Sequence, residues 1–232
     1  SRRQRQMCLR DSYVISRISG EGADRKAEPG DYYLSEQEEE ELKAITECYD
    51  NTIVILNVGG VMDVSFLEKY NIAALVMLSQ AGMEGGNALA DVLSGAVTPS
   101  GKLTDTWGCH YEDYPSSATF SHNNGNIIEE KYYEGIYVGY RYFDSFEVEP
   151  RYPFGYGMSY TTFDVATENA AWKPDAESKT ITVTVKVTNT GSCAGKEVVQ
   201  IYAACPFGKL KKERKRLVAF GKTALLQPGE SE

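Results

Sequence analysis

Thr52-Ile53-Val54-Ile55-Leu56-Asn57 is a continuous apolar run in which β-branched residues dominate. Such a run is typical of a strand that is buried on both faces, as in a parallel sheet covered by helices. Residues 12–18 predict a strand before it, and Ile72–Leu78 predict a second strand buried on both faces.

Helical segments alternate with these strands. Ser35 has the character of an N-cap, and Glu38 follows three residues later, so the pair predicts a capping box at the start of a helix that ends near Asp50. Two shorter helices are expected at 64–69 and 88–93, and the glycine at position 95 would end the second. Alternation of strand, loop and helix over 12–95 predicts a parallel α/β sheet.

The sequence changes in character after Lys102. Residues 107–158 are rich in Tyr, Gly, Asn and Pro, and their length favours a packed, functional connection over a plain loop. Apolar and polar residues then alternate from Ile181 to Val187, as in a half-buried strand, and Asn189-Thr190-Gly191 predicts a turn. Further strands are expected at 197–203 and 217–226.

The predicted fold class is therefore α/β, with a partial, parallel-type α/β sandwich followed by an all-β sandwich. Only about four strands fit before Glu232, whereas an immunoglobulin-like sandwich needs about seven. We expect an α/β sandwich domain at 1–110 with a truncated start, a connecting segment at 111–158, and a β-sandwich domain at 159–232 with a truncated end.

Charge and composition exclude several classes of function. The chain of 232 residues has a formal net charge of −9, which argues against nucleic acid as a partner. No run is long enough to span a membrane, and no signal peptide is recognisable. Five scattered cysteines without a CxxC spacing favour free thiols over a disulfide framework or a zinc site. A cytoplasmic location is expected, with a secreted or periplasmic one left open.

A glutamate between two glycines follows the first predicted strand, in Ser19-Gly20-Glu21-Gly22. Glycines allow the loop to bend sharply and to approach a ligand, so the carboxyl group of Glu21 is placed to donate a proton. Asp24 and Arg25 are candidate supports, as an ion pair that anchors the loop. Glu28 and Asp31 are the rival carboxylates on the same loop.

Four segments in order resemble the family 3 glycoside hydrolases, the β-glucosidase and β-xylosidase group. The resemblance extends from about Asp11 to Glu232, and Val187–Gly191, Gly195–Tyr202 and Pro228-Gly229-Glu230 resemble the fibronectin-III-like module of that family. The four segments are Ile15–Arg25 (ISRISGEGADR), Ala81–Leu103 (with AGMEGGNALADVLSG and PSGKL), Tyr133–Asp144 (YEGIYVGYRYFD) and Pro153–Phe163 (PFGYGMSYTTF).

This resemblance implies a retaining, exo-acting β-glycosidase, with a β-glucosidase favoured, which hydrolyses terminal β-linked sugars of oligosaccharides or β-glucosides. It implies that Glu21 is the general acid/base and that the aspartate nucleophile lies in a TIM-like barrel domain outside this chain. Ser19 and Glu84 are candidates for substrate contact, and for Glu84 a structural role as a carboxylate at the start of a helix is favoured over that contact. Neither a metal nor an organic cofactor is needed, and an oligomer is left open. The chain alone is expected to be inactive. A non-catalytic carbohydrate-binding or scaffold module is the alternative.

Other conspicuous residues favour structural roles. Arg141 and the tyrosines around it are expected to fasten the sandwich to the following module, although they could also stack on a sugar. His110 and His122 are isolated, and Lys209–Arg216 predicts an exposed basic loop. The glycines at 82–86 lack the spacing and the Lys-Ser/Thr of a P-loop, so nucleotide binding is rejected. The tyrosines are Tyr132, Tyr133, Tyr137, Tyr140 and Tyr142.

Overall fold

The computed structural model describes residues 10–18, 24–172, 181–206 and 208–232. Its residues form two compact units. The first unit contains residues 1–89 and 105–154, and the second contains residues 90–104 and 155–232. The domain boundaries expected from the sequence, at residues 110 and 158, stay a prediction.

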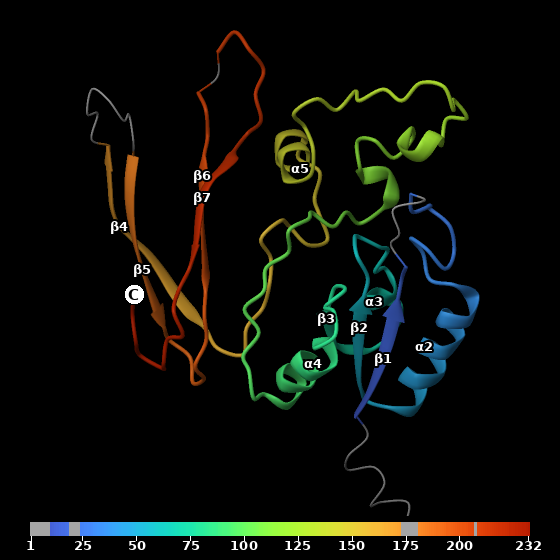
Figure 1. The fold of residues 1–232 in the computed structure, drawn as a ribbon, viewed down its shortest axis with the longest axis horizontal. Helices are drawn as coiled ribbons and strands as arrows, with labels where there is room; N and C mark the ends of the chain where they lie inside the picture. The colour runs from blue at the N-terminus through green and yellow to red at the C-terminus, as the bar shows by residue number, and fades with distance from the viewer. Residues whose placement is uncertain (1–9, 19–23, 173–180, 207) are drawn as a thin grey trace, which may run out of the picture. The chain divides into compact units, whose positions relative to one another are not determined.

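The first unit is built on a parallel sheet in the order β1-β2-β3 (Figure 1). Its strands are β1 (Arg10–Ser16), β2 (Asn51–Asn57) and β3 (Ile72–Met77). β2 lies in the middle, where Val54, Ile55 and Leu56 are at most 1% exposed, so the prediction of a strand buried on both faces is confirmed for it.

The prediction that β3 is also buried on both faces is wrong. Ala73 and Ala74 are exposed, and the remaining residues of the strand are half-buried. Among the described strands, β3 pairs with β2 alone and forms an edge of the sheet. An edge strand has a neighbour on one side only, so its apolar residues receive less cover than those of β2.

Helix α2 (Glu36–Cys48) packs beside β1 and β2, and its fully buried Leu42 joins the core of the unit. The capping box is confirmed: Ser35 Oγ accepts from the Glu38 backbone N–H, and the Glu38 carboxylate accepts from the Ser35 backbone N–H. Helix α3 (Phe66–Lys69) is a short turn whose Phe66 is also buried. Helix α4 (Gly85–Ser94) begins earlier than the sequence predicted, and Gly95 follows it with a φ of 79°.

The segment from 105 to 154 packs with the first unit and contains an element that the sequence did not reveal. This is helix α5 (Tyr140–Phe146), preceded by the 3-10 turns η1 (Tyr111–Asp113) and η2 (Phe120–His122). Phe143 of α5 is 1% exposed, and its ring meets the Tyr114 ring edge-on at 5.8 Å. Aromatic packing therefore orders a segment whose sequence shows little periodicity.

Apart from residues 90–94, the end of α4, the regular elements of the second unit are all β-strands. β4 (Phe163–Trp172) pairs antiparallel with β5 (Ile181–Asn189), and β6 (Val198–Ala203) pairs antiparallel with β7 (Arg216–Lys222). The predicted turn after β5 is held by the fully buried Asn189, whose amide nitrogen donates to the carbonyls of Cys193 and Leu226. The predicted fold class, α/β followed by an all-β part, is confirmed.

Candidate active site

The candidate site lies at the carboxyl edge of the parallel sheet in the first unit. Parallel strands end on the same side, and ligands of open α/β sheets bind outside that edge. β1 ends at Ser16, opposite Asn57 at the end of β2, and β3 ends nearby at Met77. Ser19 and Glu21 follow β1 in the sequence and lie outside the described residues.

Arg17 follows β1 immediately, and it is almost fully buried. Its side chain is 5% exposed and forms a two-pronged ion pair with Glu38, with Nη1 to Oε1 at 2.7 Å and Nη2 to Oε2 at 2.8 Å. It also donates to three backbone carbonyl groups, those of Ser16, Asp31 and Tyr33. A buried guanidinium with a bidentate carboxylate partner is held rigidly, which fixes the exit of the chain from β1.

Arg25 holds the chain on the other side of the glutamate motif. Its Nε donates to Asp31 Oδ1 at 2.6 Å, and its Nη1 donates to the Val61 carbonyl at 2.7 Å. Arg25 Nη2 and Arg17 Nε both donate to the carbonyl oxygen of Asp31, each at 2.7 Å. Two arginines that flank the motif are thus tied to one peptide group. We call Arg17, Arg25, Asp31 and Glu38 the arginine clamp.

The sequence suggested an ion pair between Arg25 and Asp24, but in the structure Arg25 pairs with Asp31. Asp24 is exposed, and within the described parts of the chain no ion pair to it is found. The turn from Lys26 to Asp31, in which the Lys26 backbone N–H donates to Asp31 Oδ2 at 2.6 Å, brings Arg25 and Asp31 together.

The clamp keeps its carboxylates ionised. Burial by itself would raise the pKa of Asp31, but hydrogen bonds from the Lys26 backbone N–H and from the Arg25 side chain outweigh it and lower that pKa. Burial likewise opposes ionisation of Glu38, and the bonds from Arg17 and Ser35 reverse the effect, so the pKa of Glu38 is lowered as well. Asp31 is thus poorly suited to act as an acid, because a proton donor near neutral pH needs a raised pKa.

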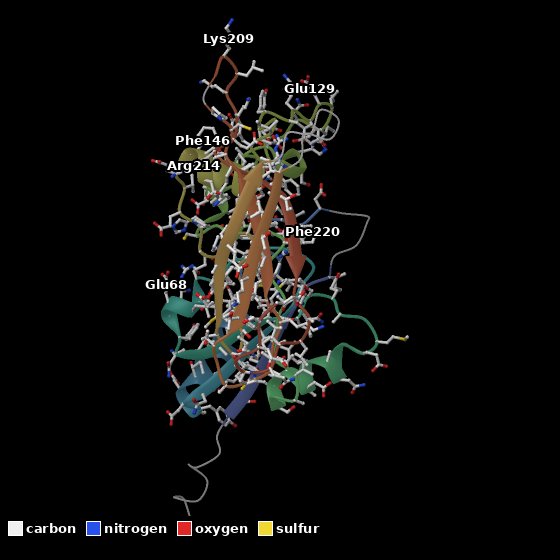
Figure 2. The ribbon with its side chains drawn as sticks, turned by 90° about the vertical axis from the view of Figure 1, so that its left-hand side faces the viewer. Glu68, Glu129, Phe146, Lys209, Arg214 and Phe220 are labelled. Atoms are coloured by element: carbon white, nitrogen blue, oxygen red, sulfur yellow. The ribbon has the colours of Figure 1, made fainter. Side chains whose placement is uncertain are left out.

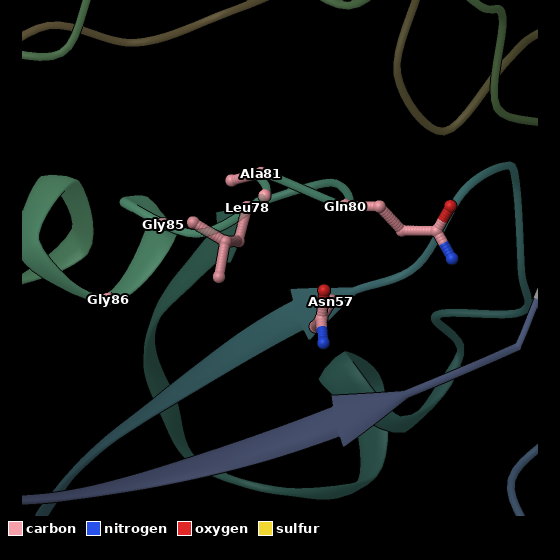
Figure 3. A pocket seen from close by; sticks show the side chains of 7 residues that line it. Asn57, Leu78, Gln80, Ala81, Gly85 and Gly86 are labelled. Carbon is pink, nitrogen blue, oxygen red and sulfur yellow. The ribbon is translucent and has the colours of Figure 1, made fainter.

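An open pocket of about 460 Å³ lies at the same edge of the sheet (Figure 3). Figure 3 shows Asn57 at the end of β2 and, across from it, the loop that carries Gln80 and Ala81 and turns into α4. The pocket is lined by Asn57, Leu78, Gln80, Ala81, Gly82, Gly85 and Gly86.

Glu84 immediately precedes α4 and is exposed. Its carbonyl accepts the Ala88 N–H, and its carboxylate accepts from the Asn87 side chain at 2.7 Å. The carboxylate therefore stabilises the start of the helix. A substrate contact of Glu84 stays a prediction.

The other singled-out residues lie elsewhere. Tyr132 and Tyr133 are largely exposed, Arg141 lies on α5, and His122 Nδ1 is 2.8 Å from the Asn126 carbonyl oxygen. Lys209 lies at the tip of the hairpin between β6 and β7 in the second unit (Figure 2). In the described ranges, no cluster of three or more His, Cys, Asp or Glu could hold a metal ion, and no helix is long and apolar enough to cross a bilayer.

Cys48, Cys109, Cys193 and Cys205 are free thiols.

The sequence analysis did not identify Arg17 as a member of the arginine clamp. A charged residue directly after a buried strand is a signal that could have indicated it, because a buried guanidinium needs partners nearby.

The chain is similar to known enzymes over nearly its whole length. Residues 7–160 match the model of the glycosyl hydrolase family 3 C-terminal domain. β-Glucosidase A of Butyrivibrio fibrisolvens is 42% identical over 94% of this chain and 30% of its own length, and the β-glucosidase of Ruminococcus albus is 40% identical over 94% of this chain and 22% of its own length.

Solved structures agree with these matches. β-Glucosidase 3B from Thermotoga neapolitana, in complex with α-D-glucose, superposes with a TM-score of 0.90 at 42% identity, over 99% of this chain and 32% of that protein. A β-glucosidase from Paenibacillus barengoltzii superposes with a TM-score of 0.92 at 43% identity, over 99% of this chain and 25% of that protein.

Fold, site and matches together place the chain in the class of glycoside hydrolase domains. The chain belongs to glycosyl hydrolase family 3 and corresponds to its C-terminal domain. It spans between about a fifth and a third of the length of the relatives that it matches.

Proposed function

We propose that this chain is part of a retaining β-glucosidase and supplies the general acid/base, Glu21, for the hydrolysis of terminal β-linked glucose. The observation that carries the proposal is the arginine clamp. It fixes the chain at Arg17 and at Arg25, on both sides of Ser19-Gly20-Glu21-Gly22, at the carboxyl edge of the sheet. The relatives named above, all described as β-glucosidases, support the reaction class.

Retaining hydrolysis needs two carboxyl groups about 5–5.5 Å apart. One attacks the anomeric carbon and forms a glycosyl–enzyme. The other first protonates the departing glycosidic oxygen and then takes a proton from the water that releases the sugar. Glu21 would be the second group, and the nucleophile would come from a barrel domain outside this chain.

Glu21 would differ in protonation from the other two carboxyl groups on the loop, those of Glu28 and Asp31. Asp31 is committed to Arg25 and ionised, and Glu28 is exposed. A glutamate between glycines can leave the surface of this unit and enter a closed, poorly hydrated site, where burial raises the pKa of a carboxyl group. Such a group stays protonated until the leaving group departs, and the reaction requires no metal or organic cofactor.

The test replaces Glu21 with alanine in the full-length protein that contains this chain. Loss of a general acid lowers the rate by about 10²–10⁴-fold. The loss in kcat/KM, which reports the first chemical step, should be large for alkyl glucosides, whose leaving groups need protonation, and small for 2,4-dinitrophenyl β-glucoside, whose leaving group departs without it. Glu28→Ala, on the same loop, is the matched control and should retain activity on both. An equal loss on both substrates would remove the acid role from Glu21.

The alternative is a non-catalytic carbohydrate-binding or scaffold module. The two proposals differ in the effect of Glu21→Ala. In a scaffold module, the substitution would reduce binding or stability, and any loss of activity would be the same for substrates with good and poor leaving groups. For the 232-residue chain alone we expect no hydrolysis of an aryl β-glucoside under either idea, since one carboxyl group cannot complete the retaining reaction. Hydrolysis by the chain alone would show that the second carboxyl group lies within it.

A further inference from the structure

We propose that residues 127–138 of the first unit form a docking surface for another part of the same polypeptide. Its partner would be an apolar surface bordered by lysine or arginine, on the part of the full-length protein that this chain does not span. We call residues 127–138 the apolar segment. The proposal is independent of the assignment of the acid/base, because none of its observations involves Glu21.

The apolar segment exposes several large apolar side chains within a short stretch. Those of Ile127, Ile128, Tyr132 and Tyr133 are between 75% and 93% exposed. They form two pairs of sequence neighbours, so the exposure is concentrated in one place. Single apolar residues are normal on a protein surface, whereas a concentration of them marks an interaction site.

Hydrogen bonds hold the turn that presents the two isoleucines. Asn126 Oδ1 accepts from the backbone N–H groups of Ile128 and Glu129, at 3.1 and 3.2 Å. The Asn126 backbone N–H in turn donates to Asn124 Oδ1 at 2.9 Å. Asparagine side chains that bind nearby backbone groups in this way fix a turn. The isoleucines therefore start from a defined conformation, and docking would cost little further conformational entropy.

The far end of the apolar segment is fastened to helix α5. Tyr137 is half-buried, and its ring meets the Phe146 ring of α5 edge-on at 5.1 Å. Its backbone N–H donates to the Glu134 carbonyl at 2.9 Å. Tyr132 and Tyr133 lie a few residues earlier and stay exposed. The first unit thus uses one tyrosine for its own packing and leaves two available to a partner, and tyrosine is enriched in protein interfaces.

The charged residues of the apolar segment indicate the charge of the partner. Three glutamates, Glu129, Glu130 and Glu134, lie within it against one lysine, Lys131. Lys131 pairs with Glu129 at 3.1 Å, and both of these side chains are at least half exposed. Charges around an apolar contact select a partner of opposite charge. A partner with lysine or arginine around its own apolar patch therefore complements this surface.

A second copy of this chain fits the apolar segment poorly. In a two-fold symmetric contact the same patch lies on both sides, so the glutamates of one copy would face those of the other. The net charge of −9 adds to this repulsion. The occupant is therefore the rest of the same polypeptide. This chain covers 30% and 22% of two β-glucosidase relatives, so most of such a protein lies outside it, and covalent linkage gives that part a high effective concentration.

Hydroxyl-radical footprinting of the full-length protein tests the proposal, because the radical oxidises tyrosine rings that solvent can reach. Tyr160 of the second unit is the internal reference, since its side chain is less exposed than those of Tyr132 and Tyr133. In the docked protein, Tyr132 and Tyr133 should be oxidised more slowly than Tyr160. Ile128→Asp would place a charge in the docked surface and should raise the oxidation of both tyrosines about fivefold.

Leu210→Asp is the matched control, because it places the same charge on an exposed apolar residue of the hairpin between β6 and β7. It should leave the oxidation of Tyr132 and Tyr133 unchanged. Should Ile128→Asp fail to fold, Ile128→Ala applies and should raise the same rates. Oxidation of Tyr132 and Tyr133 faster than that of Tyr160 in the wild type would overturn the proposal. Protection that is lost on dilution would overturn it as well, because contact within one polypeptide does not depend on concentration, and it would assign the surface to a second copy.

Discussion

Arg17→Met should destabilise the first unit severely, because it leaves the Glu38 carboxylate without its cation. The ion pair is well buried, with side chains 5% and 18% exposed, and it is bidentate. Removal of one member of a buried pair costs about 3–5 kcal/mol. Glu38 keeps its hydrogen bonds from Ser35, and the Asp31 carbonyl keeps its bond from Arg25. We therefore expect the lower end of that range, about 3 kcal/mol.

Urea unfolding followed by tryptophan fluorescence measures this loss. Trp107 is 3% exposed and belongs to the first unit, so its emission reports on the unfolding of that unit. A Trp172→Phe background removes the chain's second tryptophan. Lys69→Met is the control, because it removes an ion pair of which the lysine side chain is 57% exposed and should cost less than about 1 kcal/mol.

A cost of Arg17→Met no larger than that of Lys69→Met would show that the buried ion pair contributes no more to stability than an exposed one. The double variant Arg17→Met/Glu38→Met provides a second check. It leaves no unpaired carboxylate and should be more stable than Arg17→Met alone. A double variant less stable than the single one would show that the carboxylate of Glu38 is not the source of the loss.

Three further predictions concern stability. The pKa values of Glu38 and Asp31 are lowered in the folded state, so the stability that these two carboxylates add to the fold is complete above their ordinary pKa values of 4.5 and 3.8 and is lost as the pH falls through the lowered values. The urea midpoint of the wild type should therefore fall more steeply below pH 4.5 than that of Arg17→Met. Parallel curves for the two proteins would contradict this. Ser35→Ala removes the N-cap of α2 and should cost about 1 kcal/mol in urea unfolding, whereas no change would mean that the cap contributes nothing. Gly191→Ala would collide with Thr161 Oγ1 and the Thr162 backbone and should cost about 1–3 kcal/mol, whereas an unchanged thermal midpoint would show that the turn yields.

Local sequence signals were sufficient where local physics determines the structure. The apolar run at 52–57 and the Ser35–Glu38 capping box specify their elements through strand burial and helix-end hydrogen bonding, and both are present as predicted. The exposure of β3 could not be predicted, because an apolar run does not reveal whether its strand lies in the middle of a sheet or at its edge. Helix α5 could not be predicted either, because its order comes from contacts with distant aromatic residues such as Tyr114.

The same division applies to the site. The Gly-Glu-Gly motif is visible in the sequence, and it indicated Glu21 without any structure. The arginine clamp is not visible, because Arg17 and Glu38 are 21 positions apart and meet only when α2 packs beside β1. The partner of Arg25 was misassigned for a related reason: sequence adjacency suggested Asp24, whereas the turn at 26–31 selects Asp31.

If Glu21 is the acid/base of a retaining β-glucosidase, the product that the Glu21→Ala variant forms in the presence of azide reveals it. Without a general base, water attacks the glucosyl–enzyme slowly, whereas azide needs no deprotonation. The full-length Glu21→Ala variant, given 2,4-dinitrophenyl β-glucoside, should have a higher kcat with azide than without it. Its sugar product should then be β-glucosyl azide, with retained configuration. Glucose as the sole product, with no acceleration by azide, would contradict the claim.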